Sequence, residues 1–129
     1  MKKYDNFCSA LTNLQDIYDY EEPYNNVVLT GLVALYEICF EQSWKAIKEV
    51  LESNGVAEGR TGSPRQILKA AYQAGIIKDE QLWLDALATR NNVAHAYNQA
   101  IALDIVRQTK EIYCQMFQSL KREIDQNWQ

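Results

Sequence analysis

Apolar residues recur at helical spacing along almost the whole chain. Residues 2–20 predict one amphipathic helix, because their apolar positions alternate between intervals of three and four residues. These positions are Tyr4, Phe7, Leu11, Leu14 and Tyr18. Residues 27–54 predict a long helix with two adjacent apolar rows, and such a wide apolar face is typical of a central helix. The first row is Val28, Leu32, Leu35 and Cys39, and the second is Leu29, Val33, Tyr36, Phe40, Ile47 and Leu51.

Proline and glycine separate these helices from the rest of the chain. Pro23 interrupts the first helical pattern, because a proline disfavours helical backbone at the residue before it. Asn54-Gly55 is a typical helix stop, since glycine accepts the left-handed conformation beyond a helix end. Residues 55–62 predict a flexible loop. Ser63-Pro64 then favours a new helix start, with serine as the cap and proline at the first helical position.

Three further helices complete the pattern. The helix that starts at Ser63-Pro64 ends at Gly75, and its inward positions are expected to be Ile67, Leu68, Ala71 and Tyr72. A short helix begins after Asp79 and ends at residues 90–92, with Trp83, Leu84 and Leu87 as its apolar positions. The last helix covers about residues 99–126, and its face is Ile101, Ile105, Ile112, Met116, Leu120 and Ile124. The fold class is therefore all-α: residues 1–129 form one domain, an antiparallel up-and-down bundle of four to five helices.

The composition excludes several classes of protein and site. No apolar stretch in the 129 residues approaches the length of a membrane span, and the first residues lack the apolar core of a signal peptide. The three cysteines form no CxxC pair, which excludes a cysteine-type zinc site and a disulfide scaffold and favours buried, reduced thiols in the cytoplasm. His95 is the single histidine, so an HExxH site is excluded. We expect no metal and no cofactor.

The net charge of −4 argues against a broad basic face for nucleic acid, yet one segment is basic. Residues 60–78 contain Arg60, Arg65, Lys69 and Lys78 and no acidic residue. This segment is either a solvated helix face or a contact surface for phosphate or an acidic partner. Arg60, Arg65 and Lys69 are the candidate contacts.

The sequence around His95 contains the chemistry of a phosphate site: Arg90 is followed by four residues, His95, one residue and Tyr97. An imidazole can take up and release a proton near neutral pH, and a guanidinium binds phosphate oxygens in a bidentate manner. Together the two groups suffice to cleave a phosphodiester without metal. On a continuous helix, however, five residues correspond to a rotation of about 140°. Arg90 and His95 therefore converge only if the helix breaks at Asn91-Asn92, or if two copies of the chain meet.

The segment RNNVAHAY resembles the Rx4HxY motif of HEPN-domain proteins, and the chain length and helix order agree with this family. The chain is most similar to the nucleotidyltransferase substrate-binding subunits, also described as HepT toxins, which are encoded beside a minimal nucleotidyltransferase (MNT). The resemblance implies a homodimeric helical bundle and a metal-independent ribonuclease, with Arg90 and His95 as the catalytic pair. It also implies that Asn91 is the supporting polar residue and that Tyr97 is modified with AMP by the transferase, which would block RNA from the cleft.

Three interpretations stay open at this point. The first is a toxin-type ribonuclease that acts on RNA and is neutralised by transfer of AMP to Tyr97. The second is a non-catalytic substrate-binding subunit of a two-component nucleotidyltransferase. The third is a structural bundle in which His95 caps a helix or forms a hydrogen bond in the core.

Overall fold

The computed structural model describes residues 1–57, 59 and 62–129, and every regular element in these residues is helical. The chain forms α1 (Lys2–Leu14), the 3-10 turn η1 (Gln15–Asp19), α2 (Asn26–Ser53), α4 (Pro64–Ala74), α5 (Glu80–Asn92), the 3-10 turn η2 (Val93–His95), α6 (Gln99–Gln108), the π-turn η3 (Thr109–Tyr113) and α7 (Cys114–Asn127). With α6, η3 and α7 counted as one interrupted helix, the described residues form five main helices. The predicted all-α bundle is confirmed.

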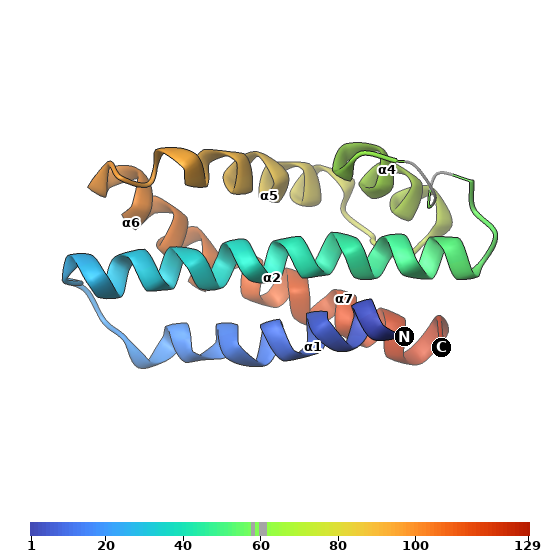
Figure 1. The fold of residues 1–129 in the computed structure, drawn as a ribbon, viewed down its shortest axis with the longest axis horizontal. Coiled ribbons are helices and arrows are strands. Elements are labelled where there is room, and N and C mark those ends of the chain that lie inside the picture. Colours follow the sequence, from blue (N-terminus) through green and yellow to red (C-terminus); the bar gives the residue numbers. More distant parts are fainter. Residues whose placement is uncertain (58, 60–61) are drawn as a thin grey trace.

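The long helix α2 is central to the bundle, as its wide apolar face predicts. It contacts α1, α4, α5 and α6. In Figure 1, α1 runs antiparallel to α2 along one side, α5 lies along the other side, and the helix formed by α6 and α7 crosses α2 diagonally. The turn between α5 and α6 thus lies at one end of the molecule, whereas α4 and both chain termini lie at the opposite end (Figure 1).

Aromatic side chains from four helices meet in the core. Phe117 of α7 is fully buried, and its ring centroid lies 6.2 Å from Phe7, 6.1 Å from Tyr36 and 5.8 Å from Trp83. These rings belong to α1, α2 and α5 respectively. Because tilted and edge-to-face arrangements of this kind are favourable, Phe117 couples α7 to three other helices.

The helix boundaries follow the capping signals in the sequence. The Ser63 side chain accepts a hydrogen bond from the Gln66 N–H, and the Gln66 side chain accepts one from the Ser63 N–H, which completes a capping box. Gly75 ends α4 with a left-handed φ of +86°. Asp79 caps α5 by accepting from the Leu82 N–H at 3.0 Å. The predicted loop at 55–62 includes residues 58, 60 and 61, which lie outside the described residues.

Three aromatic or aliphatic residues that were expected in the core are exposed instead. After Leu14 the chain tightens into the 3-10 turn η1, so the next buried position is Ile17 and Tyr18 is turned outward. In α4 the buried stripe is centred on Ile67, Ala70 and Ala71, and Tyr72 lies at its edge with 47% exposure.

The third exception is Ile112, which is 42% exposed because it falls within η3. A π-turn contains about one residue more than an α-turn, so the buried position moves from Ile112 to Tyr113. The sequence predicts one regular helix over this range and gives no sign of the π-turn.

All three cysteines are free, and two of them are buried: Cys39 and Cys114. Burial raises the pKa of both thiols, so they remain protonated and behave as small apolar side chains. The sequence-based interpretation of these cysteines as buried small residues is confirmed for this pair, whereas Cys8 is half-buried.

Candidate functional site at the turn between α5 and α6

Both helices that flank the candidate site are fixed by side-chain hydrogen bonds. On α5, the buried Tyr36 hydroxyl donates to the Ala86 carbonyl at 2.5 Å. One turn later, the Thr89 and Tyr113 hydroxyls lie 2.9 Å apart. On α6, the Asn98 side chain accepts from the N–H of Ala100 at 2.9 Å and caps the helix. The segment 93–98 is therefore a short turn held between two anchored helix ends.

Arg90 is directed toward α2. Its guanidinium forms an ion pair with Glu41 and lies over the Phe40 ring, 5.7 Å from the centroid. The second carboxylate oxygen of Glu41 accepts a hydrogen bond from the Trp44 indole at 3.1 Å. The Arg90 side chain is only 25% exposed, and its Nε atom is buried without a hydrogen-bond partner among the described residues.

His95 and Asn91 are exposed and line one hollow. This hollow has a volume of about 500 Å³, and Ala88, Thr89 and Asn92 complete its lining. Within the described part of the chain, no hydrogen bond involves the His95 imidazole, and the side chain is exposed. The interpretation of His95 as a core or capping residue is therefore wrong. The imidazole is accessible to a ligand.

Tyr97 is 81% exposed, the highest exposure among the large apolar and aromatic side chains in the described residues. Its ring centroid lies 6.4 Å from that of His95. Tyr97 also borders a second hollow of about 490 Å³, which separates the turn from α2 and is lined by Asn26, Thr30, Val33, Ala34, Glu37, Val93 and Ala96. The phenol is thus presented at the surface beside a concave region.

One chain does not bring Arg90 and His95 together. The helix α5 ends at Asn92, as the sequence predicts, and is followed directly by the 3-10 turn η2, whose flanking backbone stays right-handed. Consequently Arg90 is directed toward Glu41 of α2, whereas His95 lines a hollow to which Arg90 does not contribute. Convergence across two copies of the chain stays a prediction.

Comparison with known families identifies the fold that carries this site. A family model described as nucleotidyltransferase substrate binding protein like matches residues 2–126. The chain belongs to this family. Its fold is the HEPN-like fold, as the RNNVAHAY motif predicts.

Two solved structures are similar to this member of the nucleotidyltransferase substrate-binding family. A protein from Thermus thermophilus is 26% identical with a TM-score of 0.75, over 88% of this chain and 94% of that chain. HI0074 from Haemophilus influenzae is 19% identical with a TM-score of 0.80, over 95% of this chain and 99% of that chain. The HI0074 structure is described as revealing the fold of a substrate-binding domain of a nucleotidyltransferase. No curated protein matches the chain.

In this member of the family, residues 62–78 of the basic segment lie away from the His95 turn. Arg65 and Lys69 are exposed on α4, at the end of the bundle opposite to the turn between α5 and α6 (Figure 1). Lys78 forms an ion pair with Glu123 at 2.9 Å. Arg60 lies outside the described residues. The candidate contacts on α4 therefore do not border His95, and a role for them toward phosphate or a partner stays a prediction.

Sequence reasoning missed the residues of α2 that hold Arg90. Glu41 directly follows the buried Phe40 and precedes Trp44 by three residues. An acidic residue at the edge of the apolar face of α2 is therefore the sequence signal that could have identified it. A half-buried carboxylate of this kind is stabilised by hydrogen-bond donors, and besides Trp44 of α2 the second donor comes from another helix. Which helix supplies the donor is a tertiary fact that no local pattern contains.

The described part of the chain has neither a metal-binding cluster nor a membrane-spanning helix. No group of three or more histidine, cysteine, aspartate or glutamate side chains there is arranged to hold a metal ion. No helix in the same residues has the length and apolar character needed to cross a membrane.

Proposed function

We propose that the protein is the substrate-binding partner of a separate minimal nucleotidyltransferase (MNT), and that Tyr97 is the group to which the transferase attaches AMP. The observation that supports this proposal is the presentation of Tyr97: the phenol is 81% exposed on a turn between two anchored helix ends. Membership of the nucleotidyltransferase substrate-binding family supports the choice of partner. A cytoplasmic location belongs to the same proposal and agrees with the three free cysteines.

The proposed modification is an ordinary nucleotidyl transfer. The Tyr97 hydroxyl oxygen attacks the α-phosphorus of ATP, the bond to the β-phosphate breaks, and pyrophosphate leaves. The phenolic proton passes to the transferase, and the product is a tyrosine–AMP phosphodiester. This group adds bulk and a negative charge beside the hollow that contains His95, and such a charge repels a polyanionic ligand.

A Tyr97→Phe variant is expected to accept no AMP, because it lacks the hydroxyl oxygen that forms the phosphodiester in this proposal. The measurement is intact-protein mass spectrometry after incubation with the partner transferase, ATP and Mg²⁺. Tyr72→Phe, which changes an exposed tyrosine on α4, is the matched control and should be modified like the unchanged protein. Modification of the Tyr97→Phe protein to the same extent would contradict the proposal.

A second candidate function is metal-independent cleavage of RNA, and the exposed His95 imidazole is the observation that favours it. In this proposal, the 2′-hydroxyl of the RNA loses its proton and attacks the adjacent phosphorus, and the bond from phosphorus to the 5′-oxygen of the next nucleotide breaks. That oxygen leaves as a 5′-hydroxyl after it takes up a proton, a 2′,3′-cyclic phosphate end results, and His95 transfers the protons. Arg90 stabilises the developing charge, and Asn91 supports the hollow. Because Arg90 and His95 of one chain diverge, a homodimer is needed to place both groups on one phosphate. In this case the protein itself would be the toxin, and AMP on Tyr97 would neutralise it by repelling RNA from the hollow that contains His95.

For this candidate, we expect His95→Ala to lower the rate of RNA cleavage in EDTA at least a hundredfold, the range typical of a lost general acid or base. Gln73→Ala, an exposed change on α4, is the control. Size-exclusion chromatography of the same samples should show a dimer. Cleavage that persists in both His95→Ala and Arg90→Ala, or an active monomer, would contradict this function and leave the binding subunit as the sole proposal.

A further inference from the structure

The loop that joins η1 to α2 is fixed to the α6–η3 region by charged side chains. Both oxygens of the Glu22 carboxylate accept from Arg107, at 3.0 Å from Nε and 2.6 Å from Nη2. The Lys110 ammonium donates to the Tyr20 carbonyl at 2.5 Å and lies 5.3 Å from the Tyr24 ring centroid. Two cations from one helix thus hold the loop at three points, so the space between loop and helix is preformed.

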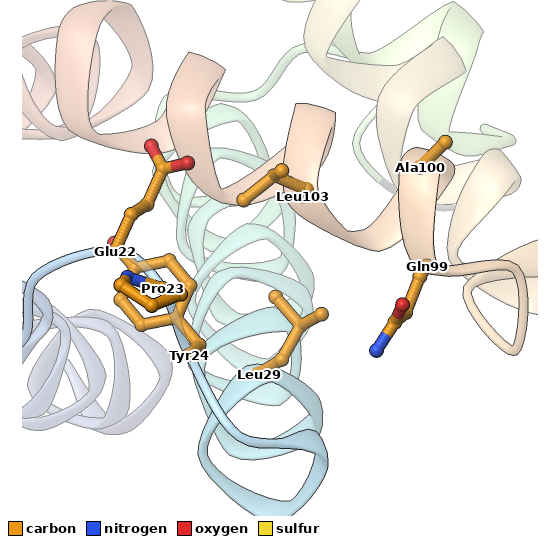
Figure 2. A pocket seen from close by; sticks show the side chains of 7 residues that line it. All are labelled: Glu22, Pro23, Tyr24, Leu29, Gln99, Ala100 and Leu103. Carbon is orange, nitrogen blue, oxygen red and sulfur yellow. The ribbon is translucent and has the colours of Figure 1, made fainter.

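That space is a cavity of about 370 Å³, within the size range of small-molecule sites. Figure 2 shows Pro23 and Tyr24 on one side of it and Gln99 on the other, with Leu29 and Leu103 between them. The floor is apolar and one wall carries two rings. Such a cavity suits a flat, uncharged ring system.

The polar groups at the cavity limit the ligand further. The Glu22 carboxylate is occupied by Arg107, and this ion pair holds its pKa below the usual value, so the carboxylate stays ionised and engaged. The Gln99 amide is exposed and forms no hydrogen bond with the described residues. A carboxamide offers a donor and an acceptor side by side, which matches the amino group and the adjacent ring nitrogen of adenine.

The cavity is also close to the proposed acceptor. Gln99 is the first residue of α6, and two residues of chain span at most about 7 Å, so its backbone lies near that of Tyr97. Tyr97 itself lines the neighbouring hollow against α2, so the ribose and phosphate of a nucleotide bound in the cavity would extend from Gln99 toward residue 97.

We infer that the cavity between the Pro23–Tyr24 wall and Gln99 is a subsite for an adenine base. This inference rests on the proposed function, because it assigns the base of a nucleotide at the nucleotidyl-accepting turn. Tyr24 and Pro23 contact the faces or edges of the ring, and Leu29 and Leu103 cover its apolar surface. The Gln99 amide pairs with the amino group and the ring nitrogen, and the two-ring purine covers more of the apolar lining than the single ring of uracil does. The base could belong to a free adenine nucleotide or to an adenosine in an RNA strand.

Calorimetric titration of the full chain tests the subsite. Adenosine and AMP are expected to bind with similar affinity, whereas ribose 5-phosphate and UMP should bind at least tenfold more weakly. In NMR spectra, adenosine should shift the methyl resonances of Leu29 and Leu103. A trinucleotide of adenosine distinguishes the two sources: tighter binding of the trinucleotide than of AMP assigns the site to RNA, and weaker binding assigns it to the free nucleotide.

Two variants at exposed positions locate the site without disturbing the core. Gln99→Ala should weaken adenosine binding about tenfold, because two hydrogen bonds are lost. Ala100→Phe adds a ring at the rim of the cavity and should weaken binding. Gln115→Ala, an exposed change on α7, is the control.

Failure of the inference and failure of the proposed function give different results. If the chain forms a complex with its transferase and accepts AMP, but neither adenosine nor the trinucleotide binds, the subsite is wrong and the function stands. Adenosine binding that is unchanged in Ala100→Phe also overturns the subsite. If adenosine binds and both variants weaken it, but the transferase neither binds nor modifies the chain, the proposed function is wrong and the cavity remains a base site.

Discussion

Truncation of Phe117 to alanine is expected to lower the free energy of unfolding by about 4 kcal/mol, the range for a fully buried phenylalanine. The side chain has no solvent exposure, and its ring contacts those of Phe7, Tyr36 and Trp83. The truncation removes these contacts and leaves a cavity between four helices that cannot all move to fill it. Urea denaturation followed by tryptophan fluorescence measures the change.

Ile112→Ala is the matched control for this prediction, because it truncates an apolar residue of the same interrupted helix that is 42% exposed. Its effect should stay below about 0.5 kcal/mol, as for ordinary surface changes. Similar losses for Phe117→Ala and Ile112→Ala would mean that the core does not depend on the aromatic cluster.

Replacement of Glu41 by alanine is expected to lower the free energy of unfolding by about 2 kcal/mol, which is the second large effect. Arg90 and Glu41 are only 25% and 27% exposed, so the variant leaves a guanidinium partly desolvated and without its carboxylate. The Trp44 indole loses its acceptor at the same time. Chemical denaturation measures the loss.

Two comparisons separate the ion pair from general damage to α2. Glu52→Ala removes a carboxylate that is 47% exposed and pairs with Lys48 one turn away. This variant should lower the free energy of unfolding by less than about 0.5 kcal/mol. In a double-mutant cycle, Arg90→Ala should be much less harmful when Glu41 is already alanine. Additive losses would mean that the two side chains do not depend on each other, and that Arg90 is free to turn toward His95.

Most of the fold could be predicted from the sequence because the signals are local. The caps at Ser63 and Asp79 and the stop at Gly75 act within one helical turn, and the two apolar rows of α2 fix its central place. The core positions that were predicted wrongly also have a local cause. A regular helical period predicts Tyr18 and Ile112 in the core, but the 3-10 turn and the π-turn interrupt that period.

The sequence locates the candidate motif but not its geometry. The spacing of Arg90, His95 and Tyr97 suffices to find the motif, and the exposed positions of His95 and Tyr97 agree with a role in binding. The orientation of Arg90 depends on Glu41, which is 49 residues distant along the chain. Likewise, the cavity beside Gln99 exists only because the loop at residues 20–24 packs against α6 and η3.

The position of the chain ends has a practical consequence for all of these measurements. Both termini lie at the end of the bundle that is opposite to the α5–α6 turn (Figure 1). A tag at either terminus therefore attaches the protein to a sensor surface with Tyr97 and the Gln99 cavity facing the solution. The transferase, nucleotides and RNA can then be passed over one immobilised sample, and the orientation is the same whichever end carries the tag.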